Sequence, residues 1–486
     1  MHSHDVIVVG NGVLGYSTVL ALLAAHPTVE IAVVGPVDRR GAASPAAGAM
    51  LGCFGEVTRV QLASAYGREK LSLAVQSTAL WPEWLAAINE DATEDQRVVI
   101  TPGTFVVLNA RSSGLDDENY VAIEQALAQH GRIAQSVDLR SVPGLDPLED
   151  CRPLRSMYLP DEGSVDSSRL LTRLSARIAA SPRVTSIEGV VESLRVSEPR
   201  IQGVTLRDGR ALDSGAVVLA AGFESQRILD TMPELARRIP RLFPGAGTSL
   251  LLQPIETDSA ITSVIRTPNR SFACGLHVVP RANGRLYVGA TNHLRLRSFE
   301  APTAYDVHFL LECTMDQIRA GLHAASIVAT NVGHRPVSID GFPLVGPTSV
   351  DGLWLMTGTY RDGLHLSPLL ARSVARELLG EKAVLTPSFV PERRPIVTMT
   401  REQAIAEAVK HQLAIGHEHA MRLPRGWHPQ LAERFADLVR SIYDMIGGDL
   451  VLPPEFVPMF ISSNARDDVI SFFQRYYASV AGPLRA

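Results

Sequence analysis

Three glycines near the N-terminus lie between a strand-like run and a helix-like run. Residues 5–9 are largely β-branched, which is typical of a strand buried on both faces of a parallel sheet, and residues 16–25 are rich in Ala and Leu. The glycines between them are Gly10, Gly12 and Gly15. A second apolar run at 30–34 completes a βαβ unit. This order predicts an α/β fold that begins with a Rossmann-like nucleotide-binding unit.

Each glycine has its own physical task in such a unit. Gly10 allows the tight turn, Gly12 lets the backbone approach a pyrophosphate, and Gly15 lets the helix pack closely on the strand. Val13 and Leu14 follow at the start of the helix, where free N–H groups and the positive dipole end attract phosphate. A purely structural glycine turn is the alternative. The motif alone does not distinguish NAD from FAD as the cofactor.

The unit departs from the usual pattern at the end of its second strand. The acidic residue that commonly binds the ribose there is replaced by Gly35. Glu30 lies at the start of that strand and Asp38 lies beyond a proline turn, so neither can be assigned the role. Ribose recognition must therefore use other groups.

Length and charge exclude several classes of protein. The 486 residues predict two or three domains, and a formal net charge of −5 argues against nucleic acid as a partner. The 4 scattered cysteines include no CxxC pair, which supports neither a zinc site nor a disulfide framework and favours a reducing cytoplasm. The apolar stretch at 6–25 contains the glycines and lacks a basic start, so we predict neither a signal peptide nor a membrane span.

Four later segments combine small residues with buried-strand patterns. Residues 41–52 form a small-residue run, able to lie flat against a large planar group, and include Ser44, Ala47, Gly48 and Met50. Residues 211–222 are typical of a buried strand that ends in Gly222. Residues 333–346 contain Gly-His-Arg-Pro and Asp-Gly-Phe-Pro, and residues 352–368 predict a glycine-rich strand-to-helix turn with Pro368 near the start of its helix.

In these motifs and in their order, the chain resembles the D-amino-acid oxidase superfamily of flavoproteins, and within it the glycine oxidase and sarcosine oxidase branch. The resemblance extends over about residues 5–382. It implies FAD as the cofactor, a Rossmann-like FAD-binding domain built from discontinuous segments, and a substrate domain whose mixed sheet covers the flavin. The expected FAD-binding segments are 1–84, 150–225 and 330–384, and the expected substrate-domain segments are 85–149 and 226–329.

The resemblance assigns roles to two arginines. Arg335, in Gly-His-Arg-Pro, corresponds to the arginine that anchors the substrate carboxylate in glycine oxidases, a task that suits a planar guanidinium. The alternative is a salt bridge to a nearby carboxylate such as Asp340. Arg361 corresponds to an arginine beside the flavin ring, where a cation would stabilise the reduced, anionic flavin. Its alternative is a surface arginine at a helix start.

The resemblance also predicts the cofactor contacts. Val190 and Val191 begin the strand whose backbone contacts the adenine in the family. We expect FAD to be non-covalent, because Phe342 and Pro343 lie where covalent members carry a cysteine. The expected cofactor-binding residues are Gly10, Gly12, Val13, Leu14, Gly15, Ser44, Ala47, Gly48, Met50, Val190, Val191, Gly222, Gly358, Arg361, Asp362, Gly363 and Leu364.

Two pocket positions depart from the glycine oxidase pattern. His277 replaces a tyrosine ahead of Val-Pro-Arg, and Asn292 replaces a methionine after Gly-Ala-Thr. Both changes make the pocket more polar and favour a bulkier or more polar substrate than free glycine, such as an N-substituted glycine or another secondary amine. A neutral hydrogen-bonding histidine on a strand is the alternative reading of His277.

Residues 385–486 extend beyond the usual family core. Prolines mark a linker, after which helices are expected at 400–415, 431–446 and 467–480, the first with Thr400 and Gln403 as capping residues. The region's histidines follow no ligand signature, so we predict no metal site; they are His411, His417, His419 and His428. We expect a helical appendage that covers part of the substrate entrance or forms a homo-oligomer interface.

The leading functional hypothesis is an oxidase of an amino acid or N-substituted glycine. A hydride leaves the carbon beside the substrate nitrogen, the resulting imine hydrolyses to a carbonyl product, and O2 is reduced to H2O2. One alternative is a dehydrogenase of the same fold with another electron acceptor, and a second is a non-catalytic flavin-binding assembly protein. A dehydrogenase using NAD alone would not explain the segments at 44–52 and 358–368.

Overall fold

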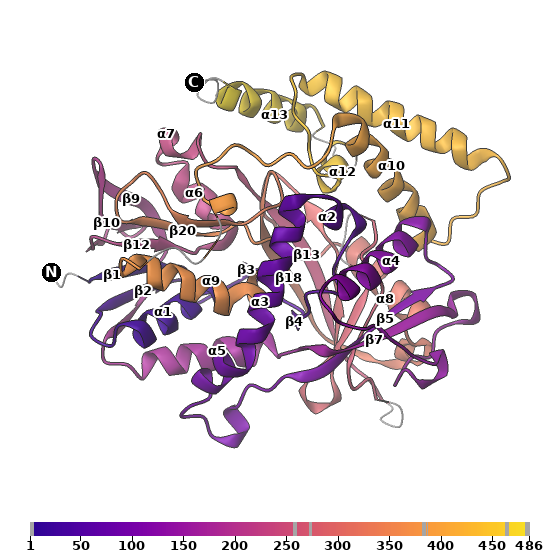
Figure 1. Ribbon diagram of the computed structural model, residues 1–486, viewed down its shortest axis with the longest axis horizontal. Coiled ribbons are helices and arrows are strands. Elements are labelled where there is room, and N and C mark those ends of the chain that lie inside the picture. The colour runs from indigo at the N-terminus through magenta and orange to yellow at the C-terminus, as the bar shows by residue number, and fades with distance from the viewer. Residues whose placement is uncertain are drawn as a thin grey trace.

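The computed structural model describes residues 4–255, 260–271, 275–381, 385, 387–461 and 466–481. It contains a six-stranded sheet, a three-stranded sheet and an eleven-stranded mixed sheet, with helices packed around them (Figure 1). The predicted α/β architecture, the mixed sheet and the helical C-terminal region are therefore confirmed. No helix within these described ranges is long and apolar enough to cross a membrane.

The six-stranded sheet contains the N-terminal βαβ unit. Its strand order is β19 (Leu344–Pro347), β20 (Leu353–Thr357), β12 (Val217–Leu219), β1 (Val6–Val9), β2 (Ile31–Gly35) and β8 (Val184–Glu188). Neighbouring strands in this sheet are parallel, except that β19 and β20 are antiparallel. One face packs against α1 (Val13–Ala25), α3 (Ala65–Ile88), α5 (Ser167–Ala179) and α9 (Gly363–Leu378). The other packs against the three-stranded sheet of β9 (Val191–Ser197), β10 (Arg200–Leu206) and β11 (Ala211–Asp213). Burial on both faces explains the unbroken apolar sequence of β1.

Some element boundaries differ from the expectation. Helix α1 begins at Val13 rather than at Tyr16, directly after the glycine turn. The expected strand at 211–222 consists of β11 and β12 in different sheets, and hydrogen bonds of the Ser214 side chain to nearby backbone stabilise the break between them. Helix α9 begins at Gly363 rather than close to Pro368, so Pro368 lies in its second turn, where proline removes a single N–H group.

The eleven-stranded sheet forms the other half of the core. Its main path is β3 (Gly41–Ala42), β18 (Ser326–Ser338), β13 (Leu242–Gln253), β16 (Leu286–Gly289), β15 (His277–Pro280), β14 (Val264–Arg266), β5 (Thr101–Asn109), β7 (Pro153–Ser164) and β4 (Met50–Leu51). Strand β17 (His293–Leu294) pairs with β13, and β6 (Gln135–Ser136) pairs with β7. Helices α2 (Arg59–Ala63), α4 (Gly114–Gln129), α6 (Ser225–Leu229), α7 (Pro233–Ala236) and α8 (Ala304–Gln317) complete this part of the chain. The division of the chain into domains stays a prediction.

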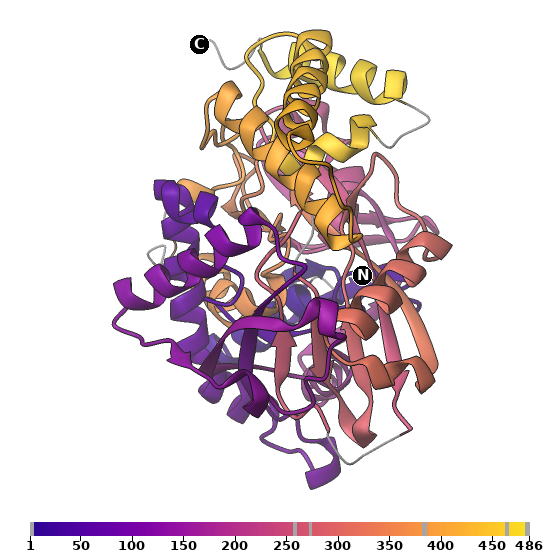
Figure 2. The ribbon, with the colours of Figure 1, turned by 90° about the vertical axis from the view of Figure 1, so that its right-hand side faces the viewer.

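The C-terminal helices gather at one end of the molecule (Figure 2). They are α10 (Arg401–Glu418), α11 (Trp427–Ile446), α12 (Val457–Ile461) and α13 (Arg466–Ala481). The predicted capping box of α10 forms, with the Gln403 N–H donating to Thr400 Oγ1 at 3.2 Å. Phe473 of α13 stacks on Phe243 of β13 with ring centroids 5.7 Å apart. The appended region is thus anchored on the large sheet.

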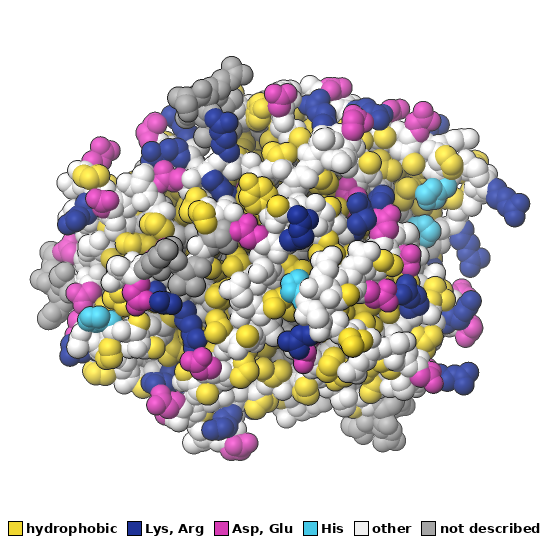
Figure 3. Space-filling view, viewed as in Figure 1, with side chains coloured by type: hydrophobic (Ala, Val, Ile, Leu, Met, Phe, Trp, Pro, Cys, Tyr) yellow, Lys and Arg dark blue, Asp and Glu magenta, His cyan; other side chains and the backbone are white. Residues whose placement is uncertain are grey.

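Charged side chains of both signs are interspersed on the surface shown in Figure 3. Lys and Arg side chains lie next to Asp and Glu side chains over most of this face. This face therefore presents no extended field of one sign, in keeping with the small net charge of the chain.

Candidate active site

A cavity of about 500 Å³, here called the inner cavity, joins the glycine turn after β1 to the large sheet. Among the predicted catalytic residues, His277, Arg335 and Arg361 line it. The predicted cofactor residues that line it are Gly10, Gly12, Val13, Leu14, Ser44, Ala47, Gly48, Met50, Val190, Val191, Gly222, Arg361, Gly363 and Leu364. Segments that are far apart in the sequence therefore meet at one site.

The glycine turn has the shape that a pyrophosphate requires. Gly10 has a φ of 118°, and a Cβ there would lie 2.3 Å from the carbonyl oxygen of Ala220. A Cβ at Gly12 would lie 3.1 Å from Ser44 Oγ and 4.0 Å from Ser44 Cβ. The first turn of α1 contains no acidic residue, so its positive end is available to phosphate. These residues fit a dinucleotide cofactor.

Three predicted cofactor residues lie outside the lining of the inner cavity. A Cβ at Gly15 would lie 1.8 Å from the Gly10 carbonyl oxygen, so Gly15 permits helix packing rather than cofactor contact. Gly358, with a φ of 69°, turns the chain after β20. The Asp362 carboxylate forms an ion pair with Lys70 at 2.7 Å and is thereby drawn away. Gly15 and Gly358 thus serve the path of the backbone, and the Asp362 side chain binds Lys70.

Packing explains the missing acidic residue at the end of β2. A Cβ at Gly35 would lie 2.3 Å from Cγ of Asn11, whose Nδ2 donates to the carbonyl oxygen of Pro36 at 2.8 Å. No larger side chain fits at position 35 while Asn11 occupies that space. Glu30 forms an ion pair with Arg183, and Asp38 lines the cavity while paired with Arg40 at 2.6 Å.

The small-residue segment at 41–52 is held against the eleven-stranded sheet by two side chains that the sequence did not identify. Tyr287 Oη donates to the carbonyl oxygen of Ala46 at 3.0 Å, and Arg281 Nη2 donates to that of Gly48 at 2.9 Å. Ser44 Oγ also accepts a hydrogen bond from the Val13 N–H at 3.1 Å. Tyr287 on β16 and Arg281, directly after β15, thus fix the backbone that lines the cavity. In the sequence, Arg281 belongs to the Val-Pro-Arg pattern that follows His277, and no predicted element covers Tyr287.

Arg335 projects from β18 and is held by the neighbouring chain segment. Its Nη1 donates to the carbonyl oxygen of Thr291 at 3.1 Å and to Asn292 Oδ1 at 3.3 Å. The alternative salt bridge to Asp340 is wrong, because Asp340 pairs with Arg393 at 2.9 Å. Asn292 does not line the inner cavity and instead donates to Tyr360 Oη at 2.5 Å. Asn292 is therefore a positioning residue for Arg335.

A glycine on the adjacent strand leaves room for the guanidinium of Arg335. A Cβ at Gly247 would lie 2.4 Å from Arg335 Nη1. We therefore expect Gly247→Ala to displace this flexible group, with about a 10- to 100-fold loss in kcat/KM for a carboxylate substrate and a urea midpoint close to wild type. Gly215→Ala, where nothing lies within 4 Å, is the matched control for steady-state kinetics and unfolding. Unchanged kinetics of Gly247→Ala would show that the guanidinium position is unimportant.

His277 is a buried, neutral group. Its Nδ1 bonds to the carbonyl oxygen of Gly275 at 2.9 Å, and its ring stacks on Tyr287 with centroids 5.8 Å apart. Desolvation by burial lowers the pKa of His277 to about 3. With Nδ1–H donating to that carbonyl, Nε2 is left as an acceptor, and it lies 3.1 Å from where a Cβ at Gly48 would be. His277 thus presents a neutral acceptor beside the small-residue segment.

The burial of His277 predicts a pH dependence of stability. Because the histidine binds its proton at about pH 6.5 when unfolded and only near pH 3 when folded, the free energy of unfolding should fall as the pH drops below 6.5. In this pH range, a histidine that is protonated only in the unfolded state lowers the free energy of unfolding by about 1.4 kcal/mol for each pH unit. Between pH 7 and 5, the free energy of unfolding measured in urea should fall by about 2 kcal/mol less in His277→Gln than in wild type. His428 is exposed, and His428→Gln is the control. Equal losses in His277→Gln and wild type would contradict this account.

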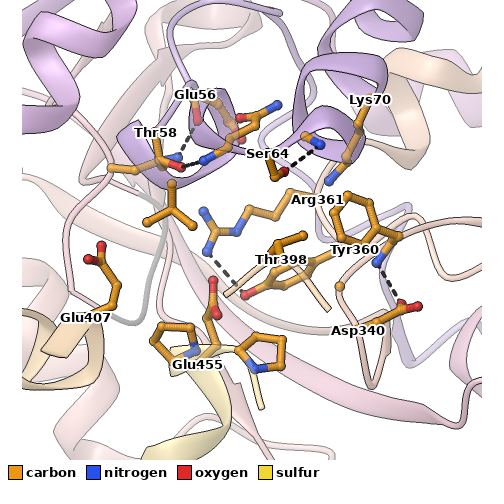
Figure 4. A pocket seen from close by; sticks show the side chains of 18 of the residues that line it. Glu56, Thr58, Ser64, Lys70, Asp340, Tyr360, Arg361, Thr398, Glu407 and Glu455 are labelled. Atoms are coloured by element: carbon orange, nitrogen blue, oxygen red, sulfur yellow. Dashed lines mark hydrogen bonds between the residues drawn. The ribbon is translucent and has the colours of Figure 1, made fainter. Parts of the chain in front are cut away.

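A second cavity of about 210 Å³, here called the outer cavity, adjoins the first. Glu56, Tyr360 and Arg361 line both cavities. Glu56 forms an ion pair with Arg266 at 3.0 Å; burial opposes its ionisation, but the charges of Arg266 and Arg361 prevail and lower its pKa. Figure 4 shows Arg361 reaching into this space, with its Nη2 3.2 Å from Tyr360 Oη. Neither Glu56 nor Arg266 was identified from the sequence, since no motif marks them.

A glycine turn of the kind that binds phosphate and two arginines, Arg335 and Arg361, line one cavity, an arrangement that fits an enzyme with a dinucleotide cofactor. The family model described as DAO, FAD dependent oxidoreductase, matches residues 5–377. The chain belongs to this family of FAD-dependent oxidoreductases, and it is an enzyme whose cofactor is FAD.

The chain is similar in sequence to a curated relative and in fold to solved structures. A glycine oxidase from Pseudomonas putida is 27% identical over 397 residues, which cover 81% of this chain and 99% of the relative. The crystal structure of a glycine oxidase from Geobacillus kaustophilus has a TM-score of 0.68 at 24% identity, covering 81% of this chain and 100% of the other. The iminodiacetate oxidase from Chelativorans sp. BNC1 has a TM-score of 0.67 at 20% identity, with 81% and 100% covered.

Proposed function

We propose that the protein oxidises the C–N bond of an amino acid or N-substituted glycine. A hydride leaves the carbon beside the substrate nitrogen, and the imine product hydrolyses to a carbonyl compound. Non-covalently bound FAD would accept the hydride and pass the electrons to O2, which gives H2O2. The glycine oxidase from Pseudomonas putida, matched over nearly its whole length, supports this reaction class.

The observation that carries the proposal is the position of Arg335. Its guanidinium lines the same cavity as the glycine turn and is fixed by Thr291 and Asn292. A planar guanidinium held in this way can bind a carboxylate through two parallel hydrogen bonds. It would thereby orient the reacting carbon, and orientation supplies much of the rate in such a reaction.

The remaining polar residues have complementary roles in this proposal. Arg361 lies where the two cavities meet, and its charge would stabilise negative charge that develops on the bound cofactor. Neutral His277 would accept a hydrogen bond from a substrate N–H group without adding a competing positive charge. Asn292 keeps Arg335 in place.

Substrate-dependent bleaching of the flavin tests the proposal directly. The purified holoprotein is mixed without oxygen with glycine, N-methylglycine, N-butylglycine and D- and L-amino acids, and flavin absorbance is followed. We expect at least one N-alkylglycine or amino acid to bleach it. Admitting air should restore the absorbance with one equivalent of H2O2; restoration only by a quinone would identify a dehydrogenase. Absence of bleaching by every member of the panel would refute the proposed reaction.

A further inference from the structure

The segment between β2 and β3 carries basic side chains close to the position of the missing ribose-binding acid. Gly35 ends β2 without a side chain, and the neutral amide of Asn11 occupies the space beside it. Arg39 and Arg40 follow in the same segment, and both line the inner cavity. A nucleotide at the glycine turn therefore meets guanidinium groups near the place where dinucleotide-binding folds commonly present a carboxylate.

The two arginines differ in their protein partners. Arg40 forms an ion pair at 2.6 Å with Asp38, which is the only acidic residue in segment 36–44. Among the described residues, no carboxylate lies within 4 Å of the guanidinium of Arg39, and its Nε is buried without a hydrogen-bond partner. Arg39 is thus a cation on the cavity wall that forms no ion pair with a described acidic side chain.

Contacts with α1 and with its own segment hold Arg39 beside the glycine turn. Its Nη2 donates to Tyr16 Oη at 2.6 Å, and the guanidinium lies over the Tyr16 ring, 5.1 Å from the centroid. Tyr16 belongs to the first turn of α1, since its N–H donates to the carbonyl oxygen of Gly12 at 3.0 Å. The carbonyl oxygen of Arg39 accepts a hydrogen bond from the Ala42 N–H at 3.0 Å. Much of the conformational freedom of this long side chain is therefore lost before a ligand binds.

The backbone of the glycine turn cannot direct all of its N–H groups at a phosphate. The Val13 N–H already donates to Ser44 Oγ at 3.1 Å. A pyrophosphate carries two negative charges, and a guanidinium offers both a compensating charge and several N–H donors. The side chain of Arg39 can thus supply binding energy that the turn alone lacks.

We propose that Arg39 binds the pyrophosphate of FAD and compensates in affinity for the ribose-binding acid that is absent at Gly35. Because the side chain beside Gly35 is the neutral amide of Asn11, it does not compete with the phosphate for the guanidinium. Arg39 contributes to cofactor affinity and not to the choice of substrate. The inference therefore goes beyond the proposed function and is tested without a substrate.

The dissociation constant of FAD, measured by isothermal titration of the full-length apoprotein, tests this inference. Arg39→Gln should raise the constant roughly 10- to 100-fold at about 50 mM NaCl, because a charged hydrogen-bonding partner is lost. At about 500 mM NaCl the difference from wild type should shrink at least roughly twofold, because salt screens the charge of the guanidinium. Arg39→Lys keeps the charge and should give a constant between those of wild type and Arg39→Gln.

Arg237→Gln is the matched control. Arg237 is exposed at the end of α7, pairs with Glu234 at 2.8 Å and lies outside the lining of the inner cavity, so its variant should bind FAD as wild type does. Urea unfolding of the FAD-free proteins should give equal midpoints for wild type and Arg39→Gln, since Arg39 has no described ion-pair partner to lose.

Two outcomes overturn the inference. One is a dissociation constant of Arg39→Gln within roughly threefold of the wild-type value at low salt. The other is an increase that is the same at both salt concentrations and is not reduced in Arg39→Lys, which would show that Arg39 shapes the segment and does not bind the phosphates. Neither outcome bears on the proposed oxidation, because that reaction is tested by bleaching with substrate.

Discussion

Replacing Arg335 by alanine should reduce kcat/KM for a carboxylate-bearing substrate by roughly 30- to 1,000-fold. The loss of one charged hydrogen-bonding partner in a partly desolvated site costs about 2–4 kcal/mol. Arg335 lines the inner cavity, and its fixed contacts to Thr291 and Asn292 pre-orient the guanidinium. The effect should fall mainly on KM, because the carboxylate is bound in the ground state as well as in the transition state.

Two comparisons separate loss of the anchor from general damage. N-methylbutylamine lacks the carboxylate of N-butylglycine, so Arg335→Ala should oxidise it no more slowly than wild type does. Arg195→Ala removes an arginine that pairs with Asp213 on the remote three-stranded sheet, and it should leave the kinetics unchanged. An Arg335→Ala variant with wild-type kinetics toward N-butylglycine would remove Arg335 from the assigned role.

The N-terminal unit could be predicted because its signals are local. The spacing of Gly10, Gly12 and Gly15 and the flanking apolar runs lie within one short segment. Gly15 meets a local constraint, since a Cβ there would lie 1.8 Å from the Gly10 carbonyl oxygen, whereas the atoms nearest to Gly10 and Gly12 belong to Ala220 and Ser44. The start of α10 was predicted for the same reason, since Thr400 and Gln403 cap each other across one turn.

The parts that could not be predicted depend on contacts between distant segments. Tyr287 and Arg281 hold the segment around Gly48, yet neither residue carries a motif for that task. The direction of Asp362 is set by Lys70 on α3. Glu455 faces Arg361 only because the appended region folds back on the large sheet, and no periodicity reports such an encounter.

Substituting valine for Gly12 should abolish FAD binding while the chain still folds. Gly12 has an ordinary φ of −80°, and the atoms near its missing Cβ belong to the short side chain of Ser44, with Oγ at 3.1 Å and Cβ at 4.0 Å. A valine side chain would instead project into the space of the pyrophosphate and hold it away from the N–H groups of α1. Losing two charge-assisted hydrogen bonds at about 1.5–3 kcal/mol each predicts a loss of FAD affinity of roughly 100-fold or more.

The matched control for this variant is Gly114→Val. Gly114 opens α4 much as Gly12 precedes α1, but nothing lies within 4 Å of its missing Cβ. Isothermal titration of apoprotein with FAD gives the affinity, and far-ultraviolet circular dichroism reports the fold. A folded, colourless Gly12→Val beside a yellow Gly114→Val is the expected result. If Gly12→Val binds FAD as tightly as wild type, the pyrophosphate does not lie at this turn, and the orientation of substrate by Arg335 relative to the flavin would have to be assigned anew.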